Sequence, residues 1–200
     1  MIKRYNQNEI EQLAQILKSG GVISVPTDTV FGICAKIDSK PAYDKLIEIK
    51  NRPKDKSFPI MCANIEQINE VAIVNEKAQK LIKEFMPGPI TLVLKKKDKL
   101  PQYVTNGKDT IAIRMATSKE LENLITKVGC PIFMTSANQS GKPECRSLDE
   151  IEKACYGLDG MMEGTVKYSK GSTIVDCTSE EIRILRQGPI SLEQIKKIIM

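Results

Sequence analysis

Apolar side chains recur at helical spacing in several segments of the chain. Residues 10–17 place their apolar side chains on one helix face, follow a cap-like pairing of Asn8 with Glu11, and stop before Gly20. The same criteria predict further helices over 46–50, 78–85 and 121–128. Two more helices are predicted, one after the capping box that starts at Ser147 and one after Ser191.

Short apolar runs between these helices predict strands over 22–25, 58–62, 90–94, 110–115, 131–134, 173–176 and 182–186. The run 110–115 alternates cleanly, so Thr110 and Arg114 share one strand face and lie about 13 Å apart. Helices and strands mix without a strict βαβ repeat. The expected fold class is therefore α/β: a single domain over residues 1–200 with a twisted mixed β-sheet flanked by helices.

Three predicted strands begin or end in small polar residues. Pro26-Thr27-Asp28-Thr29 follows the first strand, Thr135–Gly141 follows the strand over 131–134, and Gly171-Ser172 precedes Thr173. Proline cannot continue a sheet ladder, so we expect the chain to leave the sheet at Pro26 and to present oxygens at its edge. Ligands of open sheets with helices bind at such an edge. The pattern predicts one shared pocket.

The composition adds limits to this picture. Two hundred residues with 41% hydrophobic content suffice for one core. No apolar run approaches the roughly 20 residues that span a bilayer, and the first residues lack the apolar core of a signal peptide. We expect a cytoplasmic protein without membrane contact.

The six cysteines are scattered, and the chain contains no histidine. Because no paired C-x-x-C spacing occurs, we predict no metal site and free, mostly buried thiols. The missing histidine excludes Ser-His-Asp and Cys-His catalysis. Proton transfer is left to carboxylate, lysine, water or the substrate.

The formal charge of +5 suits an anionic ligand as well as a nucleic acid. Neither a P-loop nor a Rossmann fingerprint occurs, so a nucleotide would be held by other means. Arginine at a strand end is informative, because its guanidinium matches phosphate and carboxylate oxygens. Each cation alone is more typical of a solvated surface. The candidate cations are Lys50, Arg52, Lys54, Lys56, Arg114 and Arg186.

Seven motifs, taken in order, resemble those of the YrdC/TsaC-like threonylcarbamoyl-AMP synthases. They span nearly the whole chain and are weak singly but specific together. The motifs are Pro26–Ile33, Lys50–Pro53, Pro87–Thr91, Ile111–Arg114, Thr135–Gly141, Ser172–Asp176 and Arg186–Gly188.

The resemblance implies a YrdC-like fold with a large basic cavity and a nucleotidyltransferase activity. The reaction joins L-threonine, bicarbonate or CO2, and ATP into threonylcarbamoyl-AMP and pyrophosphate, for threonylcarbamoyladenosine (t6A) modification of tRNA. Mg2+ would accompany ATP, and tRNA threonylcarbamoyltransferase proteins would be the partners. The resemblance also implies the short form of the family, without an extra C-terminal domain.

The resemblance also implies roles for individual residues. The catalytic candidates are Lys50 and Arg52. The L-threonine contacts would be Thr29, Arg114, Ser136 and Ser172. The ATP contacts would be Arg52, Lys56, Thr110, Asn138, Arg146 and Arg186.

The chain departs from the family pattern at a few positions. Phe31 stands where the family usually has tyrosine, and Ile33 where it usually has leucine. The segment Ser57–Cys62 replaces the commoner Asn-Pro-Leu pattern and lacks a histidine that many members carry soon after it.

Three other functions are weighed against the synthase. A double-stranded RNA or tRNA binder fits the positive charge, but aromatics are few and no RNA-binding module occurs. The related carbamoyl-transfer domain of hydrogenase maturation factors is accompanied by an acylphosphatase domain and zinc fingers, for which this sequence has no counterpart. A paralogue that carbamoylates another substrate is the third, motivated by Ser57–Cys62.

Overall fold

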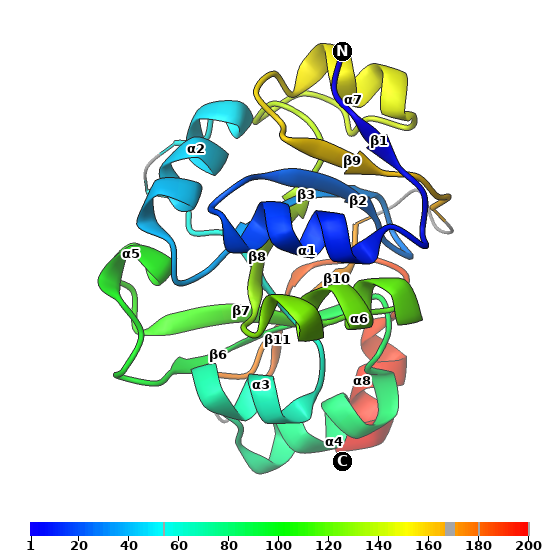
Figure 1. The fold of residues 1–200 in the computed structure, drawn as a ribbon. Helices are drawn as coiled ribbons and strands as arrows, with labels where there is room; N and C mark the ends of the chain where they lie inside the picture. Colours follow the sequence, from blue (N-terminus) through cyan, green and yellow to red (C-terminus); the bar gives the residue numbers. More distant parts are fainter. Residues whose placement is uncertain (54, 167–170, 180, 200) are drawn as a thin grey trace.

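The computed structural model describes residues 1–53, 55–166, 171–179 and 181–199. The candidate cation Lys54 lies outside the described residues. These residues form one twisted mixed sheet with helices packed on it, as the sequence predicts (Figure 1). The strand order is β1-β9-β2-β3-β8-β4-β7-β6-β10-β11, and β5 pairs with β6.

The sheet contains both parallel and antiparallel neighbours. For example, β4 pairs with β7 in parallel and with β8 in antiparallel fashion. The strands are β1 Arg4–Tyr5, β2 Ile23–Pro26, β3 Phe31–Lys36, β4 Ile60–Cys62, β5 Ala72–Ile73, β6 Ile90–Lys96, β7 Thr110–Met115, β8 Ile132–Ser136, β9 Gly160–Met162, β10 Thr173–Asp176 and β11 Arg183–Arg186.

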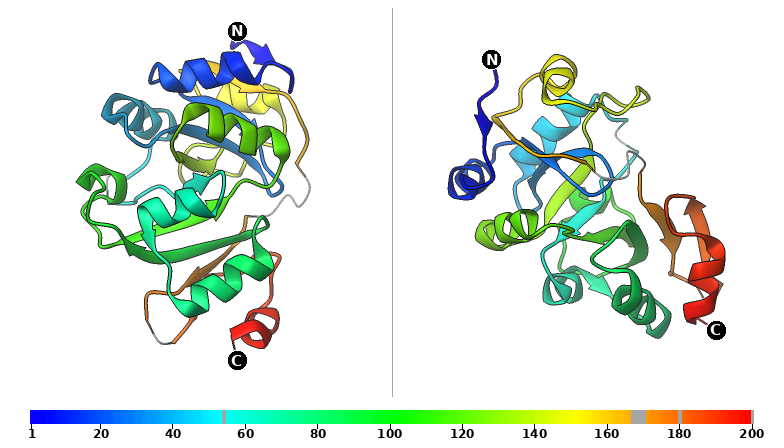
Figure 2. Two further views of the ribbon diagram at one scale, coloured as in Figure 1. Left: turned by 60° about the horizontal axis from the view of Figure 1, so that its bottom comes forward. Right: turned by 90° about the vertical axis from the view of Figure 1, so that its right-hand side faces the viewer.

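Helices cover the sheet and divide its apolar side chains into two cores. Helices α1 and α6 lie side by side and enclose one core with Met61 and Met134 (Figure 2). The other core contains Ile60, Ile113 and Phe133 and packs against α2 and further helices. The helices are α1 Ile10–Lys18, α2 Lys40–Lys50, α3 Ile65–Val71, α4 Glu76–Phe85, α5 Gln102–Thr105, α6 Lys119–Val128, α7 Leu148–Ala154 and α8 Leu192–Ile199.

Local sequence signals explain several element ends. Ser191 and Gln194 form the predicted capping box before α8, with Gln194 N donating to Ser191 Oγ at 3.2 Å. The predicted Asn8 cap of α1 is wrong, because Glu9 occupies the cap position without a side-chain cap bond. The Glu9 carboxylate accepts from the backbone of Asn6 at 2.9 Å and so fixes the preceding turn instead.

The first polar exit is the hairpin loop between β2 and β3. Pro26 is the last residue of β2 and still pairs with Phe31, and residues 27–30 connect the two strands. Proline is tolerated there because it is the last residue of the strand. The chain therefore leaves the sheet after Pro26, as predicted, and Thr27 to Thr29 are presented at its edge.

All six cysteines are unpaired, and five of them are buried, as predicted. Among residues 1–53, 55–166, 171–179 and 181–199, no group of three or more acidic or cysteine side chains is placed to hold a metal ion. Within the same described ranges, no helix has the length and apolar character needed to cross a membrane.

Candidate active site

One face of the sheet carries a row of residues from six adjacent strands. Arg114 of β7 lies opposite Met61 of β4, and the β6–β7 register places Thr91 on its other side. Directly opposed residues point to the same face, so the register alone gathers these side chains. The row that borders the cavity is Gly32, Met134, Met61, Arg114, Thr91 and Ile174.

A cavity of about 340 Å³ opens along this row. The β2–β3 loop, the exit of α2, the loop after β8 and the start of β10 complete its wall. It brings together nine of the predicted site residues. These are Thr29, Lys50, Arg52, Lys56, Arg114, Ser136, Asn138, Ser172 and Arg186.

Two predicted residues lie elsewhere. Arg146 lines a neighbouring cavity of about 360 Å³, which shares Val30, Asn138 and Glu144 with the first. Thr110 belongs to neither lining set. It starts β7, four residues before Arg114, and the strand rise carries it about 13 Å away.

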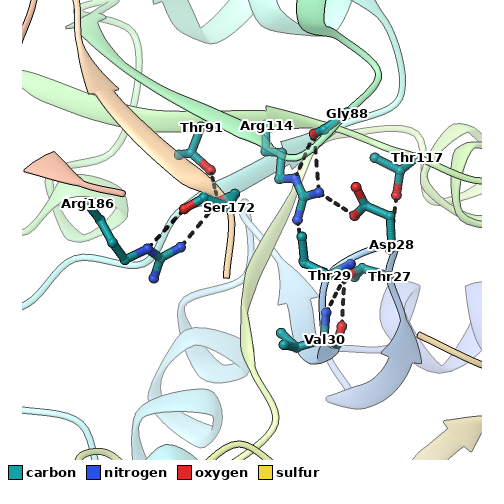
Figure 3. Close-up of polar contacts among 10 residues, drawn as sticks. All are labelled: Thr27, Asp28, Thr29, Val30, Gly88, Thr91, Arg114, Thr117, Ser172 and Arg186. Carbon is teal, nitrogen blue, oxygen red and sulfur yellow. Dashed lines mark hydrogen bonds and ion pairs between the residues drawn. The ribbon is translucent and has the colours of Figure 1, made fainter. Parts of the chain in front are cut away.

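Arg114 is held rigidly at the centre of the row (Figure 3). Its side chain is 9% exposed and forms an ion pair with Asp28, which is 13% exposed. Nη1 donates to Thr29 Oγ1 at 2.8 Å, while Nε and Nη2 both donate to the Gly88 carbonyl, at 3.3 and 3.2 Å. Burial lowers the pKa of Arg114, and Asp28 opposes that shift. Among the described residues, four of its five N–H groups thus have partners, and one on Nη1 is left for a ligand.

A second polar cluster joins β6, β10 and β11. Ser172 Oγ lies 2.7 Å from Thr91 Oγ1, and both residues are buried. Arg186 donates to the Ser172 carbonyl at 3.0 Å and to Ser172 Oγ at 3.2 Å (Figure 3). A Cβ on Gly171 would lie 2.8 Å from Arg186 Nη2, so a larger residue there would displace the guanidinium from its present position.

Lys50 binds the last residue of β8 and the loop that follows it. Its Nζ donates to the Ser136 carbonyl at 2.5 Å, to Ser136 Oγ at 3.2 Å, and to Asn138 Oδ1. An ammonium has three protons, so these contacts use them all. Lys50 therefore fixes Ser136 and Asn138 within the cavity wall. Its predicted contact with phosphates would require an exchange of partners.

We expect Lys50 to make stability depend on pH. Burial, with a contribution from Arg52, lowers the pKa of Lys50 from 10.5 to about 8. Between these two values the unfolded chain holds a proton that the folded chain has released, so stability rises with pH. Relative to Lys50→Met, the wild type should gain up to about 3 kcal/mol from pH 8 to 10.5, measured by urea unfolding. Parallel stability curves for the two proteins would contradict this prediction.

Arg52 lies at the exit of α2, where the sequence places it. Nε donates to the Lys56 carbonyl at 2.9 Å, Nη2 donates to the Ser57 carbonyl at 2.7 Å, and the guanidinium stacks 4.6 Å from the Phe58 ring centre. Burial lowers the pKa of Arg52. The contacts orient the guanidinium at the cavity wall, and Nη1 has no acceptor among the described residues.

Three residues of the site are not predicted by the sequence pattern. Thr91 lies within the Pro87–Thr91 motif, and pairing of its strand with the 110–115 strand places it beside Arg114. Asp28 belongs to the first polar strand end, but no local pattern identifies its carboxylate as the ionic partner of Arg114. Glu144 is a carboxylate in an otherwise cationic wall, and no sequence signal marked it.

Comparison with known proteins gives the same result as the motifs. The sequence profile of the Sua5/YciO/YrdC family, described as "Telomere recombination", matches residues 15–188. The chain belongs to this family. A Bacillus subtilis family member named threonylcarbamoyl-AMP synthase is 37% identical over 201 residues, which are 97% of this chain and 57% of the relative. A Vibrio campbellii protein of the same name is 33% identical and covers 89% of this chain and 98% of its own length.

Solved structures of the family share the fold. Sua5 of Pyrococcus abyssi, crystallised with L-threonine, superposes with a TM-score of 0.93 at 33% identity and covers all of this chain. E. coli YciO superposes with a TM-score of 0.88 at 24% identity, over 98% of this chain and 100% of its own. This chain spans 61% of the Sua5 structure and 57% of the B. subtilis relative, so it matches somewhat more than half of these two family members.

Proposed function

We propose that this chain is an L-threonylcarbamoyladenylate synthase, a nucleotidyltransferase that makes threonylcarbamoyl-AMP and pyrophosphate from L-threonine, bicarbonate or CO2, and ATP. The observation that carries the proposal is the cavity, where five cationic side chains meet buried hydroxyl groups on one sheet face. Cations suit a triphosphate, and an arginine with neighbouring hydroxyls suits an amino acid. The names of the relatives support the same reading.

The reaction needs positioning more than covalent catalysis. The uncharged threonine amine attacks CO2, and the resulting carbamate oxygen attacks the α-phosphate in line and expels pyrophosphate. Arg114 would anchor the threonine carboxylate, while Arg52 and Arg186 would meet the negative charge of the phosphates. Cations fixed before the reaction lower the barrier because they need no reorganisation as charge develops.

The site would bind Mg2+ together with ATP. Mg2+ is bound through oxygen, commonly by one or two carboxylates together with substrate phosphates. Glu144 is the carboxylate among the described residues of the cavity wall, so phosphate oxygens would supply most of the ligands. When bound, the ion would neutralise phosphate charge.

We also propose a setting for the enzyme. Six unpaired thiols suit a reducing compartment, which supports a cytoplasmic location. The unstable adenylate would pass to tRNA threonylcarbamoyltransferase proteins for t6A modification of tRNA.

The test is threonine-dependent release of pyrophosphate from ATP with Mg2+ and bicarbonate, with each amino acid supplied in turn. We expect Arg52→Ala to lose at least about 2 kcal/mol of transition-state stabilisation, or about thirtyfold in kcat/KM, because a charged hydrogen bond is removed. Lys95→Ala, a charge removal outside the cavity wall, is the control and should leave the rate unchanged.

Three outcomes would count against the proposal. Salt-sensitive RNA binding without any threonine-dependent turnover would favour the nucleic-acid binder. Turnover with another substrate would favour the paralogue. Unchanged pyrophosphate release by Arg52→Ala would remove Arg52 from the mechanism.

A further inference from the structure

Arg52 uses one edge of its guanidinium to hold the turn that follows it. Nε donates to the Lys56 carbonyl at 2.9 Å, and Nη2 donates to the Ser57 carbonyl at 2.7 Å. A guanidinium carries its N–H groups in a planar fork, so the Nε side is occupied. Among the described residues, the edge formed by Nη1 and Nη2 is left for a ligand. Two parallel N–H groups of this kind match two oxygens of a phosphate.

The Phe58 ring restricts the one motion that these two bonds allow. The bonds hold the guanidinium along a line through Nε and Nη2, but they permit it to turn about that line. Such a turn would swing Nη1 out of its present direction. The ring lies against the guanidinium face, with 4.6 Å between Cζ of Arg52 and the ring centre, and so limits the turn from that side. A cation over an aromatic face is also attracted to it.

Phe58 is itself held in place by the core. It is 2% exposed, and the rings of Tyr43 from α2 and Phe133 from β8 both lie 5.9 Å from it, centre to centre. The Tyr43 ring meets it edge to face, which is a favourable geometry for aromatic pairs. Of the described residues around this turn, Lys56 and Pro59 line the cavity, whereas Phe58 does not. Phe58 therefore affects a ligand in the cavity through Arg52 and not by direct contact.

The contacts of Arg52 differ in kind from those of Arg114. Arg114 forms an ion pair with Asp28, whereas the three contacts given above for Arg52 are with two carbonyl oxygens and an aromatic ring. Neutral groups orient a guanidinium without cancelling its charge. The ring thus supplies the orientation that a carboxylate supplies for Arg114, and the charge of Arg52 stays available to an anion.

We propose that Phe58 is a positioning residue that directs the Nη1–Nη2 edge of Arg52 to the phosphates of ATP. This inference rests on the proposed function, in which Arg52 meets the phosphates, and adds to it the group that orients Arg52. Phe58 lies outside the seven motifs, in the segment Ser57–Cys62 where the chain departs from the family pattern. A cation oriented before ATP binds needs no reorganisation as charge develops on the leaving pyrophosphate.

The experiment measures pyrophosphate release by Phe58→Leu, which keeps an apolar side chain but removes the ring face. We expect kcat/KM for ATP to fall about five- to tenfold, the effect of one cation–π contact, while the KM for L-threonine stays within about twofold. Leu124→Ala is the control. Leu124 is fully buried in the other core, so its truncation should lower stability at least as much and leave both kinetic values unchanged.

A double-mutant cycle separates positioning from packing. If Phe58 acts through Arg52, Phe58→Leu should change kcat/KM for ATP by less than about twofold once Arg52→Ala is present. The same loss in both backgrounds would show that Phe58 serves the fold, and would overturn the proposal. An unchanged kcat/KM for Phe58→Leu alone would overturn it too.

Should Phe58→Leu fail to fold, fluorinated phenylalanines in place of Phe58 give the answer. They nearly keep the shape of the ring but withdraw negative charge from its face, which weakens its attraction for a cation. We expect kcat/KM for ATP to fall further with three ring fluorines than with one, while the KM for L-threonine stays the same. Equal kcat/KM values for the plain and fluorinated proteins would contradict the proposal.

Failure of the proposed function would look different. A wild-type enzyme without threonine-dependent turnover would reject the synthase activity itself, whereas active wild type with an unaffected Phe58→Leu variant would reject only the role of Phe58.

Discussion

Gly188→Ala is expected to destabilise the protein by about 3 kcal/mol and to impair the active site at the same time. An alanine Cβ at this position would lie 2.3 Å from Thr173 N, 2.5 Å from the Ser172 carbonyl carbon and 2.6 Å from the Gly171 oxygen. All three are backbone atoms, which cannot turn aside as a flexible side chain does. Overpacking of this kind typically costs 1–3 kcal/mol, so we expect the upper end.

The displaced segment carries functional groups with it. Thr173 Oγ1 accepts from the backbone of Gly188 and of Ile190, both at 3.0 Å, and donates to the Ile190 carbonyl. Arg186, the last residue of β11, donates from Nε to the Ser172 carbonyl. The alanine would push the segment after β11 away from the start of β10 and so misplace Arg186. We therefore expect the KM for ATP to rise together with the loss of stability.

Gly129→Ala is the matched control for Gly188→Ala. A Cβ on Gly129 meets nothing within 4 Å, but the residue has φ +85° at the end of α6. Its replacement should cost only about 1 kcal/mol, from backbone strain, and leave the kinetics unchanged. Urea unfolding and pyrophosphate release separate the two cases. Equal destabilisation by both substitutions would refute the steric argument.

The sequence pattern predicted those helices and strands that have one face in the core and the other face toward the site or solvent. Strand β7 was predicted with its observed bounds, because its alternation separates core residues such as Ile111 and Ile113 from the site residue Arg114. Strand β3 was missed for the opposite reason. Phe31 to Ala35 are buried on both faces, so the run shows no alternation, and its first residues read as part of a loop motif.

The site was predictable as a set of neighbours but not as a set of contacts. The polar exits of three strands converge on one cavity, as their positions at strand ends suggested. The contacts of Lys50 could not be predicted from the sequence. Ser136, the last residue of β8, lies 86 residues after Lys50 along the chain and meets it only in the folded structure. Likewise, Asp28 meets Arg114 only through the pairing of distant strands, which no local pattern specifies.

The second large effect is expected for Asp28→Ala, which removes the ionic partner of Arg114. Arg114 is 9% exposed and Asp28 13% exposed, so among the described residues the substitution leaves the guanidinium with neutral acceptors only. Breaking a buried ion pair from one side typically costs 3–5 kcal/mol, because the remaining charge is uncompensated. We expect a loss of about that size in urea unfolding, together with a higher KM for L-threonine.

Two further variants isolate the charge from the packing. Asp28→Asn keeps the shape and an acceptor oxygen, so it should lose less stability than Asp28→Ala. The double variant Asp28→Ala, Arg114→Met removes both charges, and its destabilisation should be smaller than the sum of the two single losses, because no buried charge is left alone. Additive losses would mean that the pair contributes no coupling energy. In that case Arg114 would be held by Gly88 and Thr29 alone, and Asp28 would serve the loop only through its backbone contact with Thr117 Oγ1.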